Sequence, residues 1–137
     1  MFSKIILLLM INLPSLNNIN HINDLKWTNR ILVIMNKEKF DFSKNIDSLK
    51  KEFDERDFLI VNVIERNTYI HNKKMSKRFS RSVISKIKSI ENNNYIFLIG
   101  KDGQVKNSYP IDIGLEKIFD DVDKMPMRKY EMQIGEN

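Results

Sequence analysis

A short apolar run and the turn that follows it constrain the fold of this chain more than any other feature. Residues 95–99, Tyr-Ile-Phe-Leu-Ile, predict a buried strand, because an unbroken series of apolar and aromatic residues favours a strand covered on both faces. Lys101-Asp102-Gly103 predicts a tight turn that the glycine permits, and residues 105–109 predict the returning strand. Strands joined by a tight turn pair antiparallel, so the sequence predicts a β-hairpin.

The region before the hairpin predicts a parallel β-α-β unit. Residues 31–35 and 58–64 are continuous apolar runs, as expected for strands that are buried on both faces. Between them, apolar residues recur at spacings that place them on one stripe of a helix: Phe42, Ile46, Leu49 and Phe53. The connection is therefore expected to be a helix, and such crossovers are nearly always right-handed.

Two further helices complete the predicted order. Residues 65–72 are expected to form a polar connection, and the helix after them carries one apolar stripe: Met75, Phe79, Val83, Ile87 and Ile90. The last helix starts after Pro110, ends at Pro126 and has its own stripe: Leu115, Ile118, Phe119, Val122 and Met125. The order β-α-β-α-β-β-α predicts an α/β, thioredoxin-like fold in which helices flank a four-stranded mixed sheet.

The amino terminus has the layout of a secretory signal peptide. Lys4 precedes the almost unbroken apolar run of residues 5–13, which ends at Pro14. The run is shorter than the roughly 20 residues of a transmembrane helix, so no transmembrane helix is predicted. The alternative is a buried first helix or strand. The sequence predicts a signal peptide over residues 1–20, cleavage between Pro14 and His21, and one domain over residues 21–137 that is exported to the periplasm, the cell envelope or the exterior.

Composition excludes or disfavours several kinds of chemistry. The chain has no cysteine, so thiol-disulfide exchange and thiolate-based peroxide reduction are excluded. Its two histidines, His21 and His71, have no carboxylate or second histidine at ligand spacing, and no serine lies in a Gly-x-Ser-x-Gly turn. The sequence therefore predicts no catalytic residue, no metal site and no cofactor, and it leaves open whether the protein is an enzyme.

The helix predicted after residue 74 is strongly basic. Between Lys73 and Lys88 the chain carries lysines and arginines but no acidic residue. A helical projection places five cations opposite the apolar stripe as a candidate anion-binding face: Lys74, Lys77, Arg78, Arg81 and Lys88. Such a face binds anionic lipid headgroups or acidic glycans, whereas the alternative is a solvated surface. Nucleic acid is not expected as a partner, because export would separate them and no aromatic platform accompanies the charges.

Residues 125–128 form a second candidate surface. Met125, Pro126, Met127 and Arg128 make a candidate docking tail, since methionines provide an adaptable apolar surface and proline sets the direction of the chain. The alternative is that the methionines cover an edge of the domain's own core. Asp120, Asp121 and Asp123 oppose the dipole of the helix before this tail, and an ion pair with Arg128 or Lys129 would explain their position.

Several short motifs are shared with one protein family: Trp27-Thr-Asn-Arg30, Glu55-Arg56-Asp57-Phe58, Lys77-Arg-Phe79, Leu98-Ile-Gly-Lys-Asp-Gly103, Met125-Pro-Met-Arg128 and Glu131-Met132. In these motifs the chain resembles DUF4174, a domain family with relatives in extracellular sushi-repeat proteins and a thioredoxin/peroxiredoxin-like character. The resemblance implies a thioredoxin-like fold and names no activity. In thioredoxin-like enzymes the reactive cysteine follows the first strand, and the matching residues here, 36–40, include none.

Three hypotheses about function follow. The leading one is an exported, redox-inactive, thioredoxin-like binding module of the cell envelope, whose partner is an anionic surface or an envelope protein. The rival is an enzyme with non-thiol chemistry at the former cysteine position, built from Arg30, Asn36, Lys37 or Glu65. The third is a purely structural module.

Overall fold

The structure, a computed structural model, describes residues 15–35, 47–88 and 95–136. Its elements are η1 (Leu16–Asn18), η2 (Ile22–Leu25), β1 (Arg30–Met35), α3 (Lys50–Glu55), β2 (Phe58–Ile64), β3 (Asn67–Ile70), β4 (Lys73–Lys74), α4 (Lys77–Lys88), β5 (Ile96–Ile99), β6 (Val105–Tyr109), α5 (Leu115–Asp123) and α6 (Pro126–Glu136). The start of the predicted crossover helix, including Phe42 and Ile46, lies outside the described residues.

The described strands form one mixed sheet with the order β4-β3-β2-β1-β5-β6. β1 pairs parallel with β2, and β5 pairs antiparallel with both β1 and β6. These pairings confirm the predicted parallel unit and the predicted hairpin. β1 lies between β2 and β5, and its residues 30–34 are all buried. That burial on both faces explains why residues 31–35 are all apolar and do not alternate between apolar and polar.

The prediction of four strands was wrong, because six are present in the described part of the chain. The segment interpreted as a polar connection contains β3 and leads into β4, and both extend the sheet beyond β2. β3 is short and polar, yet Thr68 within it is fully buried. Its hydroxyl lies 2.7 Å from the hydroxyl of Ser80 on α4. A polar residue satisfied by one specific partner leaves no hydrophobic signal in the sequence.

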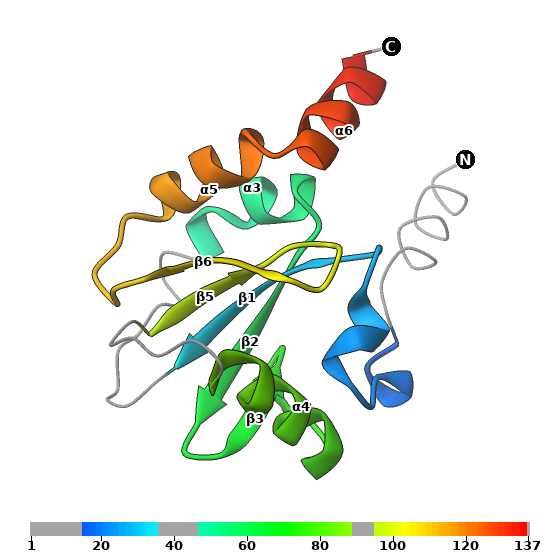
Figure 1. Ribbon diagram of the computed structural model, residues 1–137, viewed down its shortest axis with the longest axis vertical. Coiled ribbons are helices and arrows are strands. Elements are labelled where there is room, and N and C mark those ends of the chain that lie inside the picture. Colours follow the sequence, from blue (N-terminus) through cyan, green and yellow to red (C-terminus); the bar gives the residue numbers. More distant parts are fainter. Residues whose placement is uncertain (1–14, 36–46, 89–94, 137) are drawn as a thin grey trace.

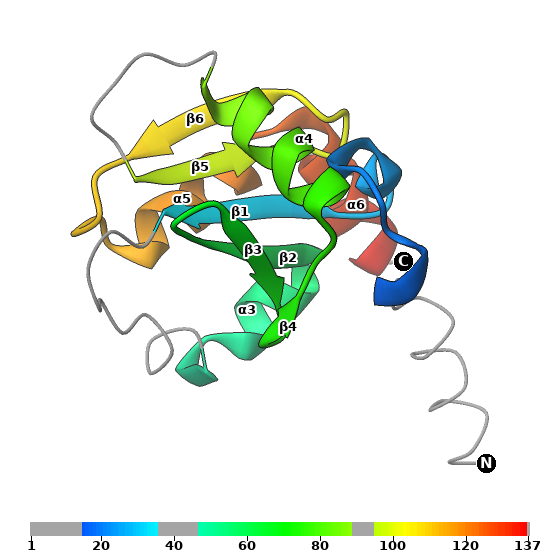
Figure 2. The ribbon, with the colours of Figure 1, turned by 90° about the horizontal axis from the view of Figure 1, so that it is seen from below.

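Helices cover both faces of the sheet, with α4 on one face and α3 and α5 on the other (Figures 1 and 2). Alternate residues of β1 point to the two faces. Ile31 and Val33 join the core that includes Phe79 and Val83 of α4. The second core, on the face of α3 and α5, contains Leu32, Ile34, Phe53, Ile118 and Phe119. The members of the predicted stripes that these described helices carry are therefore on the faces that they bury. Ile90, predicted on the stripe of α4, lies outside the described residues.

The segment after α5 is a helix and not an irregular tail. α5 ends at Asp123, and Pro126 occupies the first position of α6. Proline is tolerated at that position because the first helical N–H groups have no partner within the helix. Figure 1 shows α6 continuing beyond α5, away from the sheet. Pro126 therefore ends one helix, as predicted, and also begins another.

Residues before the predicted domain boundary belong to the folded part. Ile19 is 6% exposed and packs in the same core as α4, and Leu16 packs partly against it. The Lys73 ammonium donates a hydrogen bond to the Asn17 side chain. Ile19 and Leu16 therefore pack against the domain that is predicted to begin at residue 21.

Candidate functional site

Helix α4 is amphipathic, and local chemistry determines both its start and its orientation. The Ser76 hydroxyl accepts a hydrogen bond from the Phe79 N–H at 3.1 Å, which caps the helix. Phe79, Val83 and Ile87 are buried beneath it. The cations that alternate with this stripe must therefore face outward.

Two buried serines attach α4 to its neighbours. The Ser80 hydroxyl accepts a hydrogen bond from the Thr68 N–H at 3.3 Å, which joins the helix to β3. The Ser82 hydroxyl accepts a hydrogen bond from the Ile22 N–H at 2.9 Å and donates one to the Phe79 carbonyl at 2.6 Å. These bonds hold α4 in one position relative to the sheet and to η2, so the outward cations also have a defined position.

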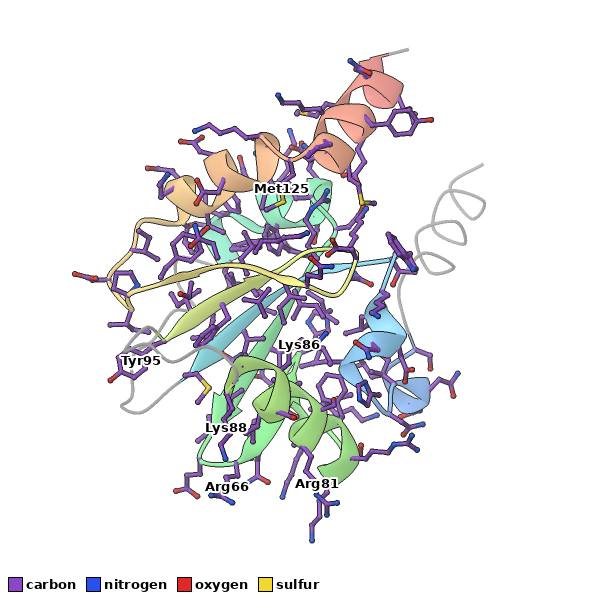
Figure 3. All side chains as sticks on the ribbon, in the orientation of Figure 1. Arg66, Arg81, Lys86, Lys88, Tyr95 and Met125 are labelled. Carbon is purple, nitrogen blue, oxygen red and sulfur yellow. The ribbon has the colours of Figure 1, made fainter. Side chains whose placement is uncertain are left out.

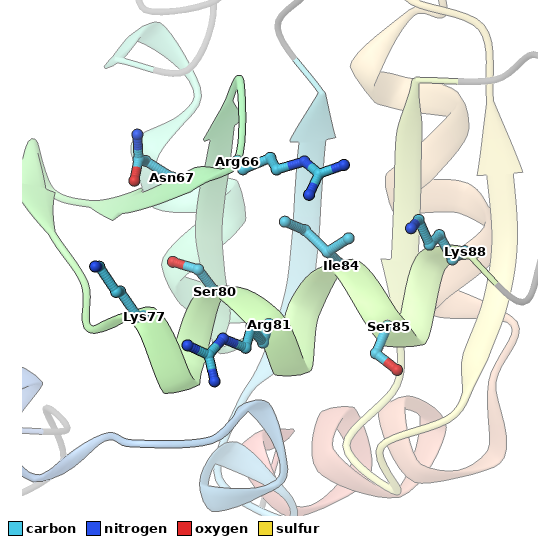
Figure 4. Close-up of a pocket in the computed structure, with 8 residues that line it drawn as sticks. All are labelled: Arg66, Asn67, Lys77, Ser80, Arg81, Ile84, Ser85 and Lys88. Carbon is cyan, nitrogen blue, oxygen red and sulfur yellow. The ribbon is translucent and has the colours of Figure 1, made fainter.

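A hollow of about 480 Å³ lies between α4 and the turn that connects β2 with β3. This α4 hollow is lined by Arg66, Asn67, Lys77, Ser80, Arg81, Ile84, Ser85 and Lys88. Four of these residues are cations and none is acidic. Figure 4 shows Lys77 toward one end of the helix, Lys88 at the other, and Arg66 extending from the turn over Ile84. Within the described residues, none of the four cations forms an ion pair.

The structure places three of the five predicted cations in the α4 hollow, and one of these three, Arg81, also lines a neighbouring depression with Arg78. Lys77, Arg81 and Lys88 line the α4 hollow. Arg78 lines a neighbouring depression beside His21, and its charge helps to lower the pKa of Asp24, after the larger effect of hydrogen bonding to the carboxylate. Lys74 lies in β4 and not on the helix, because α4 begins at Lys77. The projection was therefore wrong for Lys74.

Sequence reasoning missed Arg66 and Asn67, which form the other wall of the hollow. Both were assigned to the polar connection after β2. The connection is a two-residue turn in which Glu65 has a positive φ of 59°, and the chain then returns as β3 past α4. A turn signal around Glu65 was the only available indication, because the approach of this turn to α4 depends on long-range packing.

Lys86 shows how differently a cation of the same helix is used. Its ammonium donates hydrogen bonds to the Asn23 side chain at 3.1 Å and to the Gly103 carbonyl. Burial lowers its pKa, and the nearby charge of Lys26 lowers it further. Lys86 therefore ties α4 to η2 and to the turn after β5. It was not placed on the predicted binding face, and it does not line the α4 hollow.

A second group of charges, the ion-pair cluster, lies where β1 and β2 begin. It consists of Arg30, Arg56, Asp57, Lys101, Asp123, Arg128 and Glu131. At its centre, Glu131 of α6 accepts hydrogen bonds from Arg30 at 2.9 Å and from Lys101 at 2.6 Å. Lys101 also reaches Asp57 at 2.8 Å. The side chains of Arg30 and Lys101 are only 1% and 9% exposed, so these charges depend on their partners.

The second half of the cluster is organised by Asp123 at the end of α5. Its carboxylate accepts hydrogen bonds from Arg56 at 3.0 and 2.8 Å and from Arg128 at 3.2 Å. The expected ion pair of this acidic group is thus confirmed for Asp123 with Arg128, whereas Asp121 pairs with Lys117. Arg56 additionally lies 4.6 Å from the centre of the Phe119 ring. The two arginines offset the unfavourable interaction between the Asp123 carboxylate and the dipole of α5. Arg128 also joins α6 to α3, because it donates a hydrogen bond to the Glu55 carbonyl.

The environment of the cluster changes the acidity of both carboxylates. Burial raises the pKa of Glu131, but hydrogen bonds from Arg30 and Lys101 outweigh burial and hold that pKa below its ordinary value. Burial likewise raises the pKa of Asp123, and hydrogen bonds from Arg56 and Arg128 reverse the effect. Both carboxylates are therefore stabilised in the ionised form.

Most of the shared motifs converge on this cluster. They supply Arg30, Arg56, Lys101, Arg128 and Glu131, and the Trp27 N–H also donates to the Lys101 carbonyl at 2.7 Å. The cluster sits where β1 starts, whereas residues 36–40, which the rival enzyme hypothesis places at its pocket, follow β1 in the sequence and lie outside the described residues. A strand of six residues spans about 20 Å. Arg30 therefore lies at the opposite end of β1 from Met35, the last described residue before that segment.

The other residues of that rival pocket are not brought together by the described structure. Asn36 and Lys37 lie outside the described residues. Glu65 is in the β2–β3 turn and is not among the residues lining the α4 hollow. Among the described residues no three His, Cys, Asp or Glu side chains are grouped to hold a metal ion.

The candidate docking tail is divided between different environments. Met125 packs partly against the core beneath α5, and Arg128 is buried in the ion-pair cluster. Pro126 is exposed, and Met127 is 41% exposed. Figure 3 shows Met125 on one side of the molecule and Arg66, Arg81 and Lys88 on the other. The two candidate surfaces are therefore separate. Within the described residues no helix has the length and apolarity needed to cross a membrane.

Comparison with known proteins identifies a family for the chain. No curated protein and no solved structure matches it. A family model described as a domain of unknown function, DUF4174, matches residues 21–131. This range contains β1 to α5 and most of α6, and with them the α4 hollow and the ion-pair cluster. The protein therefore belongs to the DUF4174 family.

Proposed function

We propose that the protein is an exported, redox-inactive domain of thioredoxin-like fold that binds anionic ligands in the cell envelope through the α4 hollow. The observation that carries the proposal is the lining of this hollow by Arg66, Lys77, Arg81 and Lys88 without a carboxylate. Like charges repel one another, so this arrangement costs stability unless an anion compensates it. The ion-pair cluster shows that the same chain does supply carboxylates to cations that serve the fold.

The strand arrangement supports a thioredoxin-like fold as part of this proposal. β2, β1, β5 and β6 are neighbours in this order, and β5 runs opposite to the other three. β3 and β4 are additions beyond β2, and the turn before β3 carries Arg66. The addition to the core fold thus creates one wall of the hollow. The absence of cysteine excludes thiol redox chemistry from this fold.

Export rests on Lys4 and the apolar run of residues 5–13. The burial of Ile19 adds a constraint, because cleavage after that residue would remove it from the core. Cleavage before Leu16 would retain these contacts. A reporter that is active only outside the cytoplasm, fused after residue 20, is expected to give signal. A cytoplasmic reporter pattern, together with a purified protein that still begins at Met1, would refute export.

Binding is tested with the purified domain and immobilised polyanions at increasing salt. The wild-type protein is expected to bind at low salt and to elute as salt screens the charges. Replacing Lys77, Arg81 and Lys88 together by glutamate is expected to abolish binding, whereas Lys129→Glu, on exposed α6, is the control and should bind as the wild type does. Wild-type protein that ignores every anionic probe at low salt would refute the proposal.

A further inference from the structure

The α4 hollow is elongated in a way that limits the shape of its ligand. Lys77 and Lys88 are the first and last residues of α4. At 1.5 Å per residue they are separated by about 16 Å along the helix axis. Arg81 lies between them on the helix, and Arg66 forms the facing wall. A single small anion could neutralise only part of this line of charges. An extended ligand that carries repeated charges could reach all of it.

The neutral groups of the hollow favour a ligand with many hydroxyl groups. Asn67 contributes an amide at one wall, and Ser85 contributes an exposed hydroxyl on the helix. Amides and hydroxyls both donate and accept hydrogen bonds, which matches the bonding capacity of a sugar hydroxyl. Charges spaced along the groove and neutral hydrogen-bonding groups between them correspond to a chain of acidic sugars.

The same lining disfavours the two other common polyanions. Ile84 is the only apolar side chain among the described lining residues, and none is aromatic. Single-stranded nucleic acid is bound largely by stacking of bases on aromatic rings, which this hollow lacks. An interfacial helix inserts apolar side chains into the lipid, but the apolar stripe of α4 is buried in the core.

We propose that the α4 hollow binds an acidic polysaccharide, a linear glycan with carboxylate or sulfate groups, which lies along α4 from Lys77 to Lys88 beneath Arg66. This inference rests on the proposed function and deepens it, because it names the class of ligand. The ligand's anionic groups contact the four cations, and its hydroxyl groups contact Asn67 and Ser85.

The test compares the binding of five probes by titration calorimetry at one salt concentration. The probes are a four-sugar oligogalacturonate, the galacturonate monomer, neutral maltotetraose, vesicles that contain phosphatidylglycerol, and a single-stranded oligonucleotide. Oligogalacturonate is expected to bind, the monomer much more weakly because it reaches only part of the groove, and maltotetraose not at all. An equally tight monomer would overturn the inference, as would a single-stranded oligonucleotide that binds tighter than the oligogalacturonate.

Two variants test the position of the glycan in the α4 hollow. Arg66 is in the wall that faces α4, and Lys88 is at the end of α4. Arg66→Gln and Lys88→Gln are each expected to weaken oligogalacturonate binding about two- to fivefold, the size of one exposed charge contact. Lys129→Gln, the control with the same loss of charge, should bind as the wild type does. Thermal unfolding identifies any variant that fails to fold, and Lys88→Gln tests the site independently of the turn.

The outcomes separate the inference from the proposed function. One outcome is that oligogalacturonate does not bind while vesicles bind through Lys77, Arg81 and Lys88. This outcome would refute the acidic polysaccharide as the ligand, and the proposed function, binding of anionic ligands, would stand. Binding that is unchanged in both Arg66→Gln and Lys88→Gln would also overturn the inference. If neither oligogalacturonate nor the vesicles bind at low salt, both the inference and the proposed function fail.

Discussion

The ion-pair cluster and the α4 hollow each gather four cations, and only one of them gathers carboxylates. In the cluster, Arg30, Arg56, Lys101 and Arg128 face Asp57, Asp123 and Glu131. In the hollow, the residues that line the space include no carboxylate at all. The two groups lie at different parts of the molecule and come from different elements. Positive charge alone therefore does not distinguish a residue that holds the fold together from one that is available to a ligand.

The cations of the cluster have carboxylate partners and those of the hollow do not because the two groups differ in exposure to solvent. Removing a charge from water is costly, so a buried cation such as Arg30 must be compensated by a well-placed carboxylate. The cations of the hollow stay hydrated and need no partner for folding. We therefore expect opposite consequences from neutralising a charge in the two places, with a large loss of stability in the cluster and little change in the hollow.

The largest effect is expected for Glu131→Gln. The substitution leaves Arg30 and Lys101 buried without their shared carboxylate. Breaking a buried pair in this way lowers the free energy of unfolding by about 3–5 kcal/mol, which chemical denaturation would measure. Glu116→Gln, at an exposed position in the first turn of α5, is the matched control, and it should lower the free energy of unfolding by no more than about 1 kcal/mol, the contribution of the helix dipole. Similar small losses in both variants would show that the cluster contributes little.

Asp123→Asn is expected to lower the free energy of unfolding less, by about 1–3 kcal/mol, the cost of losing hydrogen bonds to a charged group. The loss is smaller because Arg56 and Arg128 are 11% and 10% exposed, whereas Arg30 is only 1% exposed. Arg56 and Arg128 also keep the Glu52 and Glu55 carbonyls as acceptors. Denaturation of the double variant with Glu131→Gln sharpens the comparison. Arg128 lies 3.7 Å from Glu131, so a combined loss different from the sum is expected, and strict additivity would mean that the two halves act independently.

Acid should weaken the cluster by protonating the same carboxylates. Because the pKa of Glu131 is lowered in the folded state, its contribution is complete above the ordinary value of 4.5 and is lost as pH falls through the lower folded value. The melting temperature of the wild type should therefore fall below that pH, and its advantage over Glu131→Gln should shrink. Arg81→Gln should show the acid profile of the wild type. A constant advantage of the wild type down to strongly acidic pH would contradict this assignment.

The smallest effect is expected in the hollow, and its sign is opposite. Lys77 and Arg81 are four residues apart on α4, where like charges destabilise a helix by about 0.2–0.5 kcal/mol. Arg81→Gln should therefore leave stability unchanged or raise it by that amount, and salt should remove the gain. Thermal unfolding at low and high salt measures it. A loss above about 1 kcal/mol would place Arg81 among the structural charges instead.

Some features of both regions could be predicted from the sequence because they depend on near neighbours. The apolar stripe of α4 predicted that Lys77, Arg81 and Lys88 would face outward, since helical periodicity relates these residues directly. A pairing of Asp120, Asp121 or Asp123 with Arg128 or Lys129 was predicted because these residues are close in the chain, and Asp123 and Arg128 form it. The shared motifs also predicted the correct family. They gave no indication that most of them would meet in one cluster.

The sequence by itself determined the class of fold, the parallel unit, the hairpin and the exclusion of thiol chemistry, because periodicity and composition are local properties. Only the tertiary structure decided that Glu131 joins Arg30 and Lys101, and that Arg66 faces α4 across a hollow. Arg30 and Glu131 are separated by 101 positions in the chain. No local preference relates residues so far apart. Their contact depends on where the tertiary fold places α6, because buried charges of opposite sign must meet to offset the cost of leaving water.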